Sequence, residues 1–344
     1  MTQTTRTLRV DRDRPEPRLI EEAAAVLRGG GLVAFPTETV YGLGAEATNS
    51  QAVARIFEAK GRPSSNPLIV HGADVESIRM AVSGWPFVAD QLAERFWPGP
   101  LTLVLPRSGI IPDLVTGGKD TVGIRIPDSE VALSLFRTAG MIVAAPSANR
   151  STRVSPTRAE HVQKDLGGRV AMILDSGPTS IGIESTVLDL TTDPPRILRP
   201  GAITRTQIGK VLGIEIPSHT LSSDQSEGIA SSPGQMKVHY APRTDMAIFN
   251  SKRMVKESWP SDKSIGLIVV GQNFDAEIGE PTLRVDWHEP TQASRDLYQI
   301  LHAWDDGHLD LIYVVMPPES DEWLAVRDRL WRATRHWAKG EELA

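Results

Sequence analysis

The sequence of 344 residues contains no cysteine. Disulfide frameworks, thiolate zinc sites and thiol nucleophiles are therefore excluded. No apolar run approaches the roughly 18–20 residues that a membrane-spanning helix needs. The N-terminal stretch MTQTTRTLRVDRDRPEP has no apolar segment of the kind found in a secretory signal. We therefore expect a cytoplasmic protein with no membrane partner.

Several common catalytic motifs are also missing. The stretch from Gly117 to Asp120 lacks the spacing and the hydroxyl of a phosphate-binding P-loop, and no GxGxxG opens a helix after a strand. HExxH and GxSxG are absent, so zinc-hydrolase and nucleophilic-serine chemistry lose most of their support. We expect no protein-built metal site. The net charge of −6 does not indicate a nucleic-acid binder, although a local basic pocket stays open.

The most informative stretch that is present is KGRPSSNPLIVH, residues 60–71. A helical pattern at 52–59 precedes it and an apolar strand-like run at 68–70 follows it. One glycine and two prolines prevent a continuous helix between them. Its polar groups are Lys60, Arg62, Asn66 and His71. Polar groups on a rigid loop are typical of anion-binding and catalytic sites, and a solvated turn is the alternative.

Helical and strand-like segments alternate over the first two hundred residues. The helices that we expect are 18–28, 52–59, 74–82, 85–97, 131–139 and 157–166. The strands that we expect are 32–35, 68–70, 101–105, 122–126, 141–145, 170–174, 183–190 and 197–201. Residues 1–15 are expected to form a loose arm, and PTETVYGLG (36–44) a strand end followed by a glycine-rich turn. This alternation predicts an α/β domain with a mixed sheet.

Residues 217–243 are rich in serine, glycine and proline, which predicts a linker. The strands expected after it are 246–249, 265–270, 283–285 and 311–315. The helices expected there are 291–304 and 321–337. This pattern predicts a second, smaller Rossmann-like three-layer domain.

Many polar side chains fall at the ends of the predicted strands. They are Thr37, Thr39, Lys60, Arg62, His71, Arg125, Ser147, Asn149, Ser185 and Arg199. Ligands of open α/β sheets bind outside the carboxyl ends of the strands, so we expect these groups to converge. Three arginines and one lysine suit phosphates and a carboxylate. The alternatives are a turn-capping Thr37, a surface Arg125 and an Asn149 that only ties its own loop.

A series of motifs in this chain resembles the YrdC-like family. The Lys-x-Arg and Ser-x-Asn pair stands at 60–62 and 147–149. Around it, in family order, are PTETVYGLG (36–44), FEAKGRP (57–63), NPLIVH (66–71), FWPGPLTLVL (96–105), DTVGIRIP (120–127), APSAN (145–149), SPT (155–157), IGIESTVLDL (181–190) and ILRPG (197–201). HYAPR (239–243) and ASRDLYQILHAWDD (293–306) resemble the two-domain threonylcarbamoyl-AMP synthases of that family.

The resemblance implies a fold and a domain plan. The fold class is α/β, with a twisted mixed-sheet YrdC-like domain that carries a concave pocket, and a smaller Rossmann-like C-terminal domain. The implied boundaries are 16–205 for the catalytic domain, 206–244 for the interdomain linker and 245–344 for the C-terminal domain. Gln235 and Val238 depart from the family pattern in the linker.

The resemblance also implies a reaction and a set of site residues. L-threonine, bicarbonate or CO₂, and ATP would give threonylcarbamoyl-AMP and pyrophosphate, with Mg²⁺ accompanying ATP. The catalytic residues implied are Lys60 and Arg62. The ATP-binding residues implied are Arg62, Asn66, Thr121, Ser147, Asn149, Ser155, Arg199 and Tyr240. The threonine-binding residues implied are Thr39, His71, Arg125 and Ser185.

The implied partners lie downstream of this reaction. A tRNA threonylcarbamoyl-transferase complex would move the group to the adenosine next to the anticodon of ANN-decoding tRNAs, and a weak direct contact with tRNA is compatible with this role. Two alternatives are an RNA-binding module and a carbamoyl-transfer enzyme of hydrogenase maturation. The acidic balance disfavours the first, and the absence of zinc-finger cysteines disfavours the second.

Overall fold

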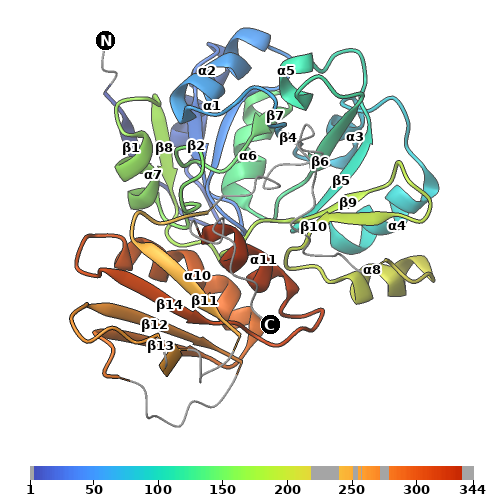
Figure 1. The fold of residues 1–344 in the computed structure, drawn as a ribbon. Helices are drawn as coiled ribbons and strands as arrows, with labels where there is room; N and C mark the ends of the chain where they lie inside the picture. The colour runs from blue at the N-terminus through green and yellow to red at the C-terminus, as the bar shows by residue number, and fades with distance from the viewer. Residues whose placement is uncertain (1–3, 218–239, 251–254, 257, 272–278, 335–344) are drawn as a thin grey trace. The chain divides into compact units, whose positions relative to one another are not determined.

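The computed structural model describes residues 4–217, 240–250, 255–256, 258–271 and 279–334. It divides into two compact units (Figure 1). The first contains the described residues up to 217 except 152–154, and the second contains 152–154 with the described residues from 240 onward. The boundaries 16–205, 206–244 and 245–344 stay predictions. In the described parts of the chain, no helix is long and apolar enough to cross a membrane.

The first unit is built on one mixed sheet. Its strands are β1 (Arg6–Arg9), β2 (Val33–Phe35), β3 (Gly42–Glu46), β4 (Ile69–His71), β5 (Leu101–Pro106), β6 (Thr121–Arg125), β7 (Val143–Ala145), β8 (Met172–Asp175), β9 (Thr186–Asp189) and β10 (Arg196–Arg199). Their order is β1-β8-β2-β3-β7-β4-β6-β5-β9-β10. β4 pairs with β6 in parallel, whereas β6 pairs with β5 and β4 with β7 antiparallel. The predicted mixed sheet is confirmed.

Several helices of the first unit begin at a residue whose side chain caps them, as the helices after Asn49 and Thr204 do. The helices of this unit are α1 (Pro17–Arg28), α2 (Ser50–Lys60), α3 (Val75–Arg79), α4 (Phe87–Phe96), α5 (Asp113–Thr116), α6 (Glu130–Ala139), α7 (Ala159–Leu166) and α8 (Arg205–Leu212). The Asn49 side chain accepts two backbone N–H groups at the start of α2. Gly61 ends α2 in the left-handed conformation, with φ +62°. This stop fixes the point at which the chain leaves the helix after Lys60.

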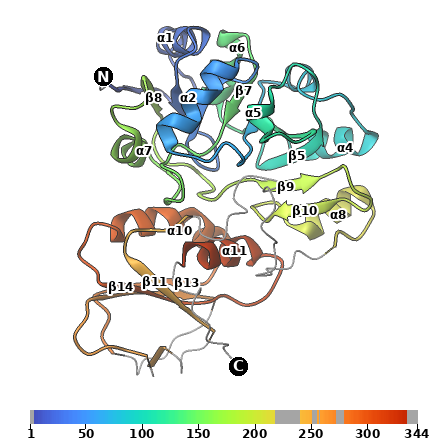
Figure 2. The ribbon, with the colours of Figure 1, turned by 45° about the horizontal axis from the view of Figure 1, so that its top comes forward.

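Alternating side chains of the strands bury both faces of the sheet. Val33 and Phe35 of β2 pack in a cluster with residues of α1 and α6, two helices that lie side by side (Figure 2). Ala34 belongs to the larger cluster, which includes residues of α2, α4 and α7. On β6, Val122 and Ile124 join that larger cluster. The alternation predicted for this strand is therefore confirmed, and Arg125 lies on the opposite face.

Two expectations for the N-terminal part of the chain are wrong. Residues 6–9 are not a loose arm, because they form β1 and pair in parallel with β8. Residues 42–46 form β3 instead of a turn. A Cβ atom on Gly44 would lie 2.7 Å from Cε1 of Phe35 and 2.8 Å from Cγ1 of Val143. A glycine stands in this strand because the Phe35 ring needs the space above it, and such a packing reason is invisible in the sequence.

The structure also adds a helix to the segment predicted as a linker. α8 starts with a capping box in which Thr204 accepts the backbone N–H of Gln207, and the Gln207 side chain accepts the backbone N–H of Thr204. Ile208 of this helix is buried in the larger cluster of the first unit. The prediction missed α8 because its eight residues carry only one fully buried side chain.

The second unit contains a parallel four-stranded sheet. Its strands are β11 (Asp245–Phe249), β12 (Ile265–Val270), β13 (Leu283–Trp287) and β14 (Leu311–Val315), in the order β11-β14-β12-β13. Its described helices α10 (Pro290–Trp304) and α11 (Leu324–Ala333) contact each other. Val255 packs with alternate residues of β12 and β14, namely Leu267, Val269 and Val315. The α/β class of the second unit is confirmed.

Candidate active site

Two of the predicted polar residues, His71 and Arg125, lie on the face of the first sheet that carries Gly123. In the parallel pair β4/β6, Ile69 lies opposite Gly123 and His71 lies opposite Arg125. Residues directly opposite each other point to the same face. His71 and Arg125, which are far apart in the sequence, therefore lie side by side.

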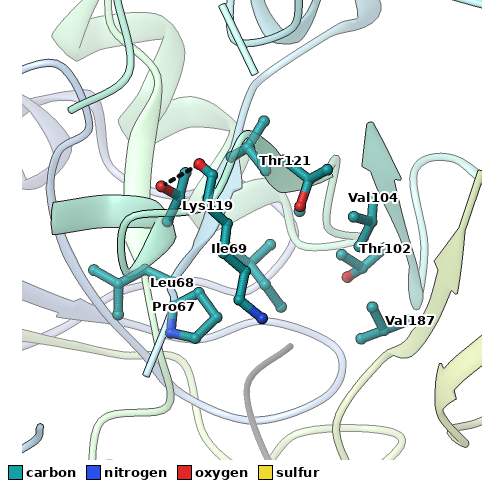
Figure 3. A pocket seen from close by; sticks show the side chains of 11 residues that line it. Pro67, Leu68, Ile69, Thr102, Val104, Lys119, Thr121 and Val187 are labelled. Carbon is teal, nitrogen blue, oxygen red and sulfur yellow. Dashed lines mark hydrogen bonds between the residues drawn. The ribbon is translucent and has the colours of Figure 1, made fainter. Parts of the chain in front are cut away.

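A small hollow of about 10 Å³, with room for about one water molecule, lies on this face beside Gly123. Figure 3 shows the side chains around it, with the hydroxyls of Thr102 and Thr121 among them. Its lining residues come from the loop before β4, from β4, β5 and β6, from Thr116 of α5 and Lys119 just after it, and from Val187 of β9. A Cβ atom on Gly123 would lie 3.2 Å from Cγ2 of Thr102. Thr121 lies at this hollow, and its expected role in ATP binding stays a prediction.

Arg125 is buried in an ion pair. Its Nη2 lies 2.7 Å from Oε1 of Glu38, and both side chains are about 95% buried (4% and 5% exposed). Nη2 also donates to Oγ1 of Thr39 at 3.0 Å, and Nε donates to the backbone oxygen of Gly99 at 3.1 Å. The alternative of an ordinary surface arginine is wrong. The guanidinium of Arg125 is instead held inside the fold by a buried carboxylate and by two hydrogen bonds.

Lys60 joins the Lys-x-Arg motif directly to the Ser-x-Asn motif. Its Nζ donates to the backbone oxygens of Ser147, at 2.6 Å, and Asn149. The Ser147 hydroxyl donates to Oδ1 of Asn149 at 2.6 Å. Burial, with a smaller contribution from the Arg62 guanidinium, holds the pKa of Lys60 well below its usual value. Lys60, the last residue of α2, therefore positions the loop after β7.

The loop between α2 and β4 is braced by its own arginine. Nε of Arg62 donates to the backbone oxygen of Asn66 at 3.1 Å, and Nη2 donates to that of Pro67 at 2.9 Å. Lys60, Arg62 and Asn66 are all buried. The prediction of a rigid loop fits these contacts, and the alternative of a solvated turn is wrong.

A second cluster of predicted residues surrounds Ser185, which directly precedes β9. Arg199 donates twice to the backbone oxygen of Ser185, at 2.9 and 3.1 Å, and once to its hydroxyl, at 3.1 Å. The Ser185 hydroxyl is also 2.8 Å from Oγ1 of Thr102. The Ser155 hydroxyl donates to the carboxylate of Glu184 at 2.5 Å. Residues expected on the ATP side and on the threonine side are therefore direct neighbours here.

His71 is buried beside Arg125. Its Nδ1 is 3.1 Å from the backbone oxygen of Ile69. The rings of Phe35 and Phe136 lie 6.5 and 6.4 Å from its ring. Burial, with a smaller contribution from Arg125, lowers the pKa of His71 to about 3. The imidazole is therefore neutral near pH 7 and is a weak base.

Tyr240 belongs to the second unit. Its ring stacks on that of Tyr298 at 5.6 Å, and the Arg329 guanidinium lies 5.1 Å from the ring centre. His239, which precedes it in the HYAPR motif, lies outside the described residues. The expected role of Tyr240 in ATP binding stays a prediction.

The described residues contain no group of three or more histidine, aspartate or glutamate side chains able to hold a metal ion.

Comparison with known proteins identifies the family. Threonylcarbamoyl-AMP synthase of Pyrococcus abyssi is 43% identical over 332 residues, which are 94% of this chain and 96% of that protein. The Bacillus subtilis threonylcarbamoyl-AMP synthase is 44% identical over 91% of this chain and 92% of its own. This chain belongs to the threonylcarbamoyl-AMP synthase family. The resemblance inferred from the sequence motifs is confirmed.

Family models divide the threonylcarbamoyl-AMP synthase sequence into two parts. The Sua5, YciO and YrdC model, described as telomere recombination, matches residues 25–201. The model for the C-terminal domain of threonylcarbamoyl-AMP synthase matches 203–334. The crystal structure of P. abyssi Sua5 complexed with L-threonine superposes with a TM-score of 0.87, at 40% identity, over 96% of this chain and 97% of that one. The predicted fold is confirmed.

Three polar residues of this synthase-family site were not selected from the sequence. Glu38 lies within the PTET motif, of which only Thr37 and Thr39 were predicted as site residues. Thr102 is the one polar residue of the apolar strand LTLVL, and Glu184 precedes Ser185. All three are buried in the structure. A polar residue inside an otherwise apolar strand is the signal that would have identified Thr102.

Proposed function

We propose that this chain synthesises threonylcarbamoyl-AMP and pyrophosphate from L-threonine, bicarbonate or CO₂, and ATP. The observation that carries the proposal is the direct contact of Lys60 with the Ser147–Asn149 loop, on the same sheet as the buried Arg125. Two cationic subsites, one for phosphates and one for a carboxylate, match a reaction between ATP and an amino acid.

The chemistry needs no nucleophile from the protein. The threonine amine attacks CO₂ and becomes a carbamate, whose oxygen attacks the α-phosphorus of ATP. Pyrophosphate then leaves. Catalysis consists of holding the two reactants in line and neutralising the charge that develops on the phosphoryl oxygens. Buried, pre-positioned cations perform this better than mobile surface groups, because they need no reorganisation during the reaction.

We assign the proposed roles as follows. Lys60 and Arg62 neutralise the triphosphate at the reacting centre. The other residues of the nucleotide subsite are Asn66, Thr121, Ser147, Asn149, Ser155, Arg199 and Tyr240. Arg125 binds the threonine carboxylate, and the rest of the threonine subsite consists of Thr39, His71 and Ser185. The neutral state of His71 suits a hydrogen bond to threonine rather than proton abstraction.

The proposal also includes a metal ion that accompanies ATP and the partners that receive the product. Mg²⁺ enters with ATP and supplies charge neutralisation at the phosphates. The product passes to a tRNA threonylcarbamoyl-transferase complex in the cytoplasm, and direct contact of this chain with tRNA is weak. The acidic balance of the sequence supports the last point.

Pyrophosphate release with single omissions tests the proposal. Release should require ATP, threonine and bicarbonate together. Lys60→Ala and Arg62→Ala should each slow it by about a hundredfold or more, since each removes a charged group at the reacting phosphate. Lys164→Ala on α7 and Arg95→Ala on α4, both exposed, are matched controls and should leave it unchanged. Release that proceeds equally without threonine would refute the proposal, and dependence on carbamoyl phosphate would support carbamoyl transfer instead.

A further inference from the structure

Glu38 is a buried carboxylate for which the roles assigned above leave no task. It follows β2, and its side chain is only 4% exposed. Its Oε1 lies 2.7 Å from Nη2 of Arg125, but neither carboxylate oxygen accepts an aligned hydrogen bond from a described residue. Arg125 directs its aligned hydrogen bonds to Thr39 and Gly99 instead. Burying a carboxylate whose oxygens accept no hydrogen bond lowers the stability of the fold, unless a ligand supplies hydrogen-bond donors.

The charges of this pair match those of a free amino acid. Glu38 and Arg125 together carry one negative and one positive charge in a buried place. A zwitterionic amino acid carries the same two charges two bonds apart. If its carboxylate binds Arg125, its ammonium lies within reach of the carboxylate that already contacts the same guanidinium. Each charge of the amino acid and of the buried pair then has a partner of opposite sign.

We propose that Glu38 receives the α-ammonium group of threonine and takes a proton from it, which makes the amine nucleophilic toward CO₂. This inference rests on the proposed function. An N–H bond breaks and an O–H bond forms on Glu38, which leaves a lone pair on nitrogen. That lone pair forms the bond to the carbon of CO₂, and a second proton leaves nitrogen for water. Glu38 returns its own proton to water after the product has left.

The other titratable groups near this pair are less suited to the task. His71 faces Arg125 from β4, but its Nδ1 already lies 3.1 Å from the backbone oxygen of Ile69. Asp128 follows β6 and is exposed to solvent, whereas the carboxylate that contacts Arg125 is buried. Glu184 already accepts a hydrogen bond from Ser155. Glu38 is thus the buried carboxylate in contact with the carboxylate-binding arginine.

Binding to Glu38→Gln separates this role from simple support of Arg125. Calorimetry compares L-threonine with (R)-3-hydroxybutanoate, which keeps the carboxylate and the hydroxyl in threonine's configuration but has no amine. The variant should bind threonine about tenfold to a hundredfold more weakly, because a charged hydrogen bond is lost. It should bind the analogue at least as well as the wild type does, since an anion near Arg125 has been removed. Equal weakening of both ligands would overturn the proposal.

The pH profile gives a readout that a structural role would not move. Glu38→Gln can use only threonine that is already deprotonated, so its kcat/KM for threonine should rise about tenfold per pH unit between about pH 7 and pH 9. The wild type should show a flatter rise. Glu46→Gln at the end of β3 is the matched control and should follow the wild type. Parallel profiles for Glu38→Gln and wild type would overturn the proposal.

Glu38→Asp covers the case in which the glutamine variant does not fold. It retains the charge with a shorter reach, so it should weaken threonine binding, spare the analogue and keep the wild-type profile. Equal weakening of the two ligands by this variant overturns the proposal too. If the wild type itself makes no threonylcarbamoyl-AMP, the proposed function fails. If the wild type makes it and Glu38→Gln matches the wild type, only the role of Glu38 fails.

Discussion

Replacing His71 with glutamine removes a buried titrating group from β4 and should change how stability depends on pH. Burial lowers the pKa of His71 from 6.5 to about 3. Between these two pH values the unfolded chain binds a proton on this residue and the folded chain does not. The stability that the neutral imidazole contributes is therefore fully present above pH 6.5 and is lost as the pH falls toward 3.

The size of the effect follows from the width of this window. Each pH unit inside it corresponds to about 1.4 kcal/mol. When the pH falls from about 7.5 to about 5, about 1.5 pH units of this fall lie below 6.5, inside the window. His71 therefore accounts for a loss of about 2 kcal/mol in the free energy of unfolding. The carboxylates also titrate in acid, but they are the same in wild type and variant.

Urea unfolding of wild type and His71→Gln at both pH values measures the effect. The difference between their free energies of unfolding should shift by about 2 kcal/mol between the two conditions, in the direction that favours the variant in acid. A difference that is the same at both pH values would show that His71 titrates normally. Such a result would remove the argument that His71 is neutral and would make it a rival to Glu38 as proton acceptor.

Three further substitutions test the packing of the site. Arg125→Ala should lower the free energy of unfolding by about 3–5 kcal/mol in urea titrations, because it leaves Glu38 buried without a counter-ion; a loss below about 1 kcal/mol would contradict the buried pair. Thr102→Val keeps the shape but removes the hydroxyl partner of Ser185, which should destabilise by about 1 kcal/mol and raise KM for threonine in steady-state assays. Gly44→Ala should destabilise by about 1–3 kcal/mol in thermal unfolding, because the added methyl overlaps the aromatic ring above it.

The sequence predicted most of the elements, and the misses have physical reasons. The strand–helix alternation depends on local patterning, and helix ends such as Gly61 carry local signals. β3 was missed because its glycines make room for Phe35, a contact between strands that is not a local property. β1 was missed because a short polar edge strand is defined by its partner β8.

The same distinction applies to the site. The sequence could name Arg125 and His71, because cations and imidazoles at strand ends are visible locally. It could not show that β4 and β6 are neighbours in a register that sets the two residues opposite each other. The ion pair with Glu38 depends on that tertiary arrangement. The placement of Lys60 was also unexpected: it was predicted on a loop that faces a ligand, whereas it ends helix α2 and donates to its own fold.

Direct detection of the product tests the central claim. The chain is incubated with ATP, L-threonine and carbon-13 bicarbonate, and the nucleotides are analysed by mass spectrometry. We predict threonylcarbamoyl-AMP that is heavier by the one labelled carbon, formed together with pyrophosphate and strongly reduced in Lys60→Ala. AMP and pyrophosphate without a labelled threonyl adduct, or an adduct that forms without ATP, would contradict the account.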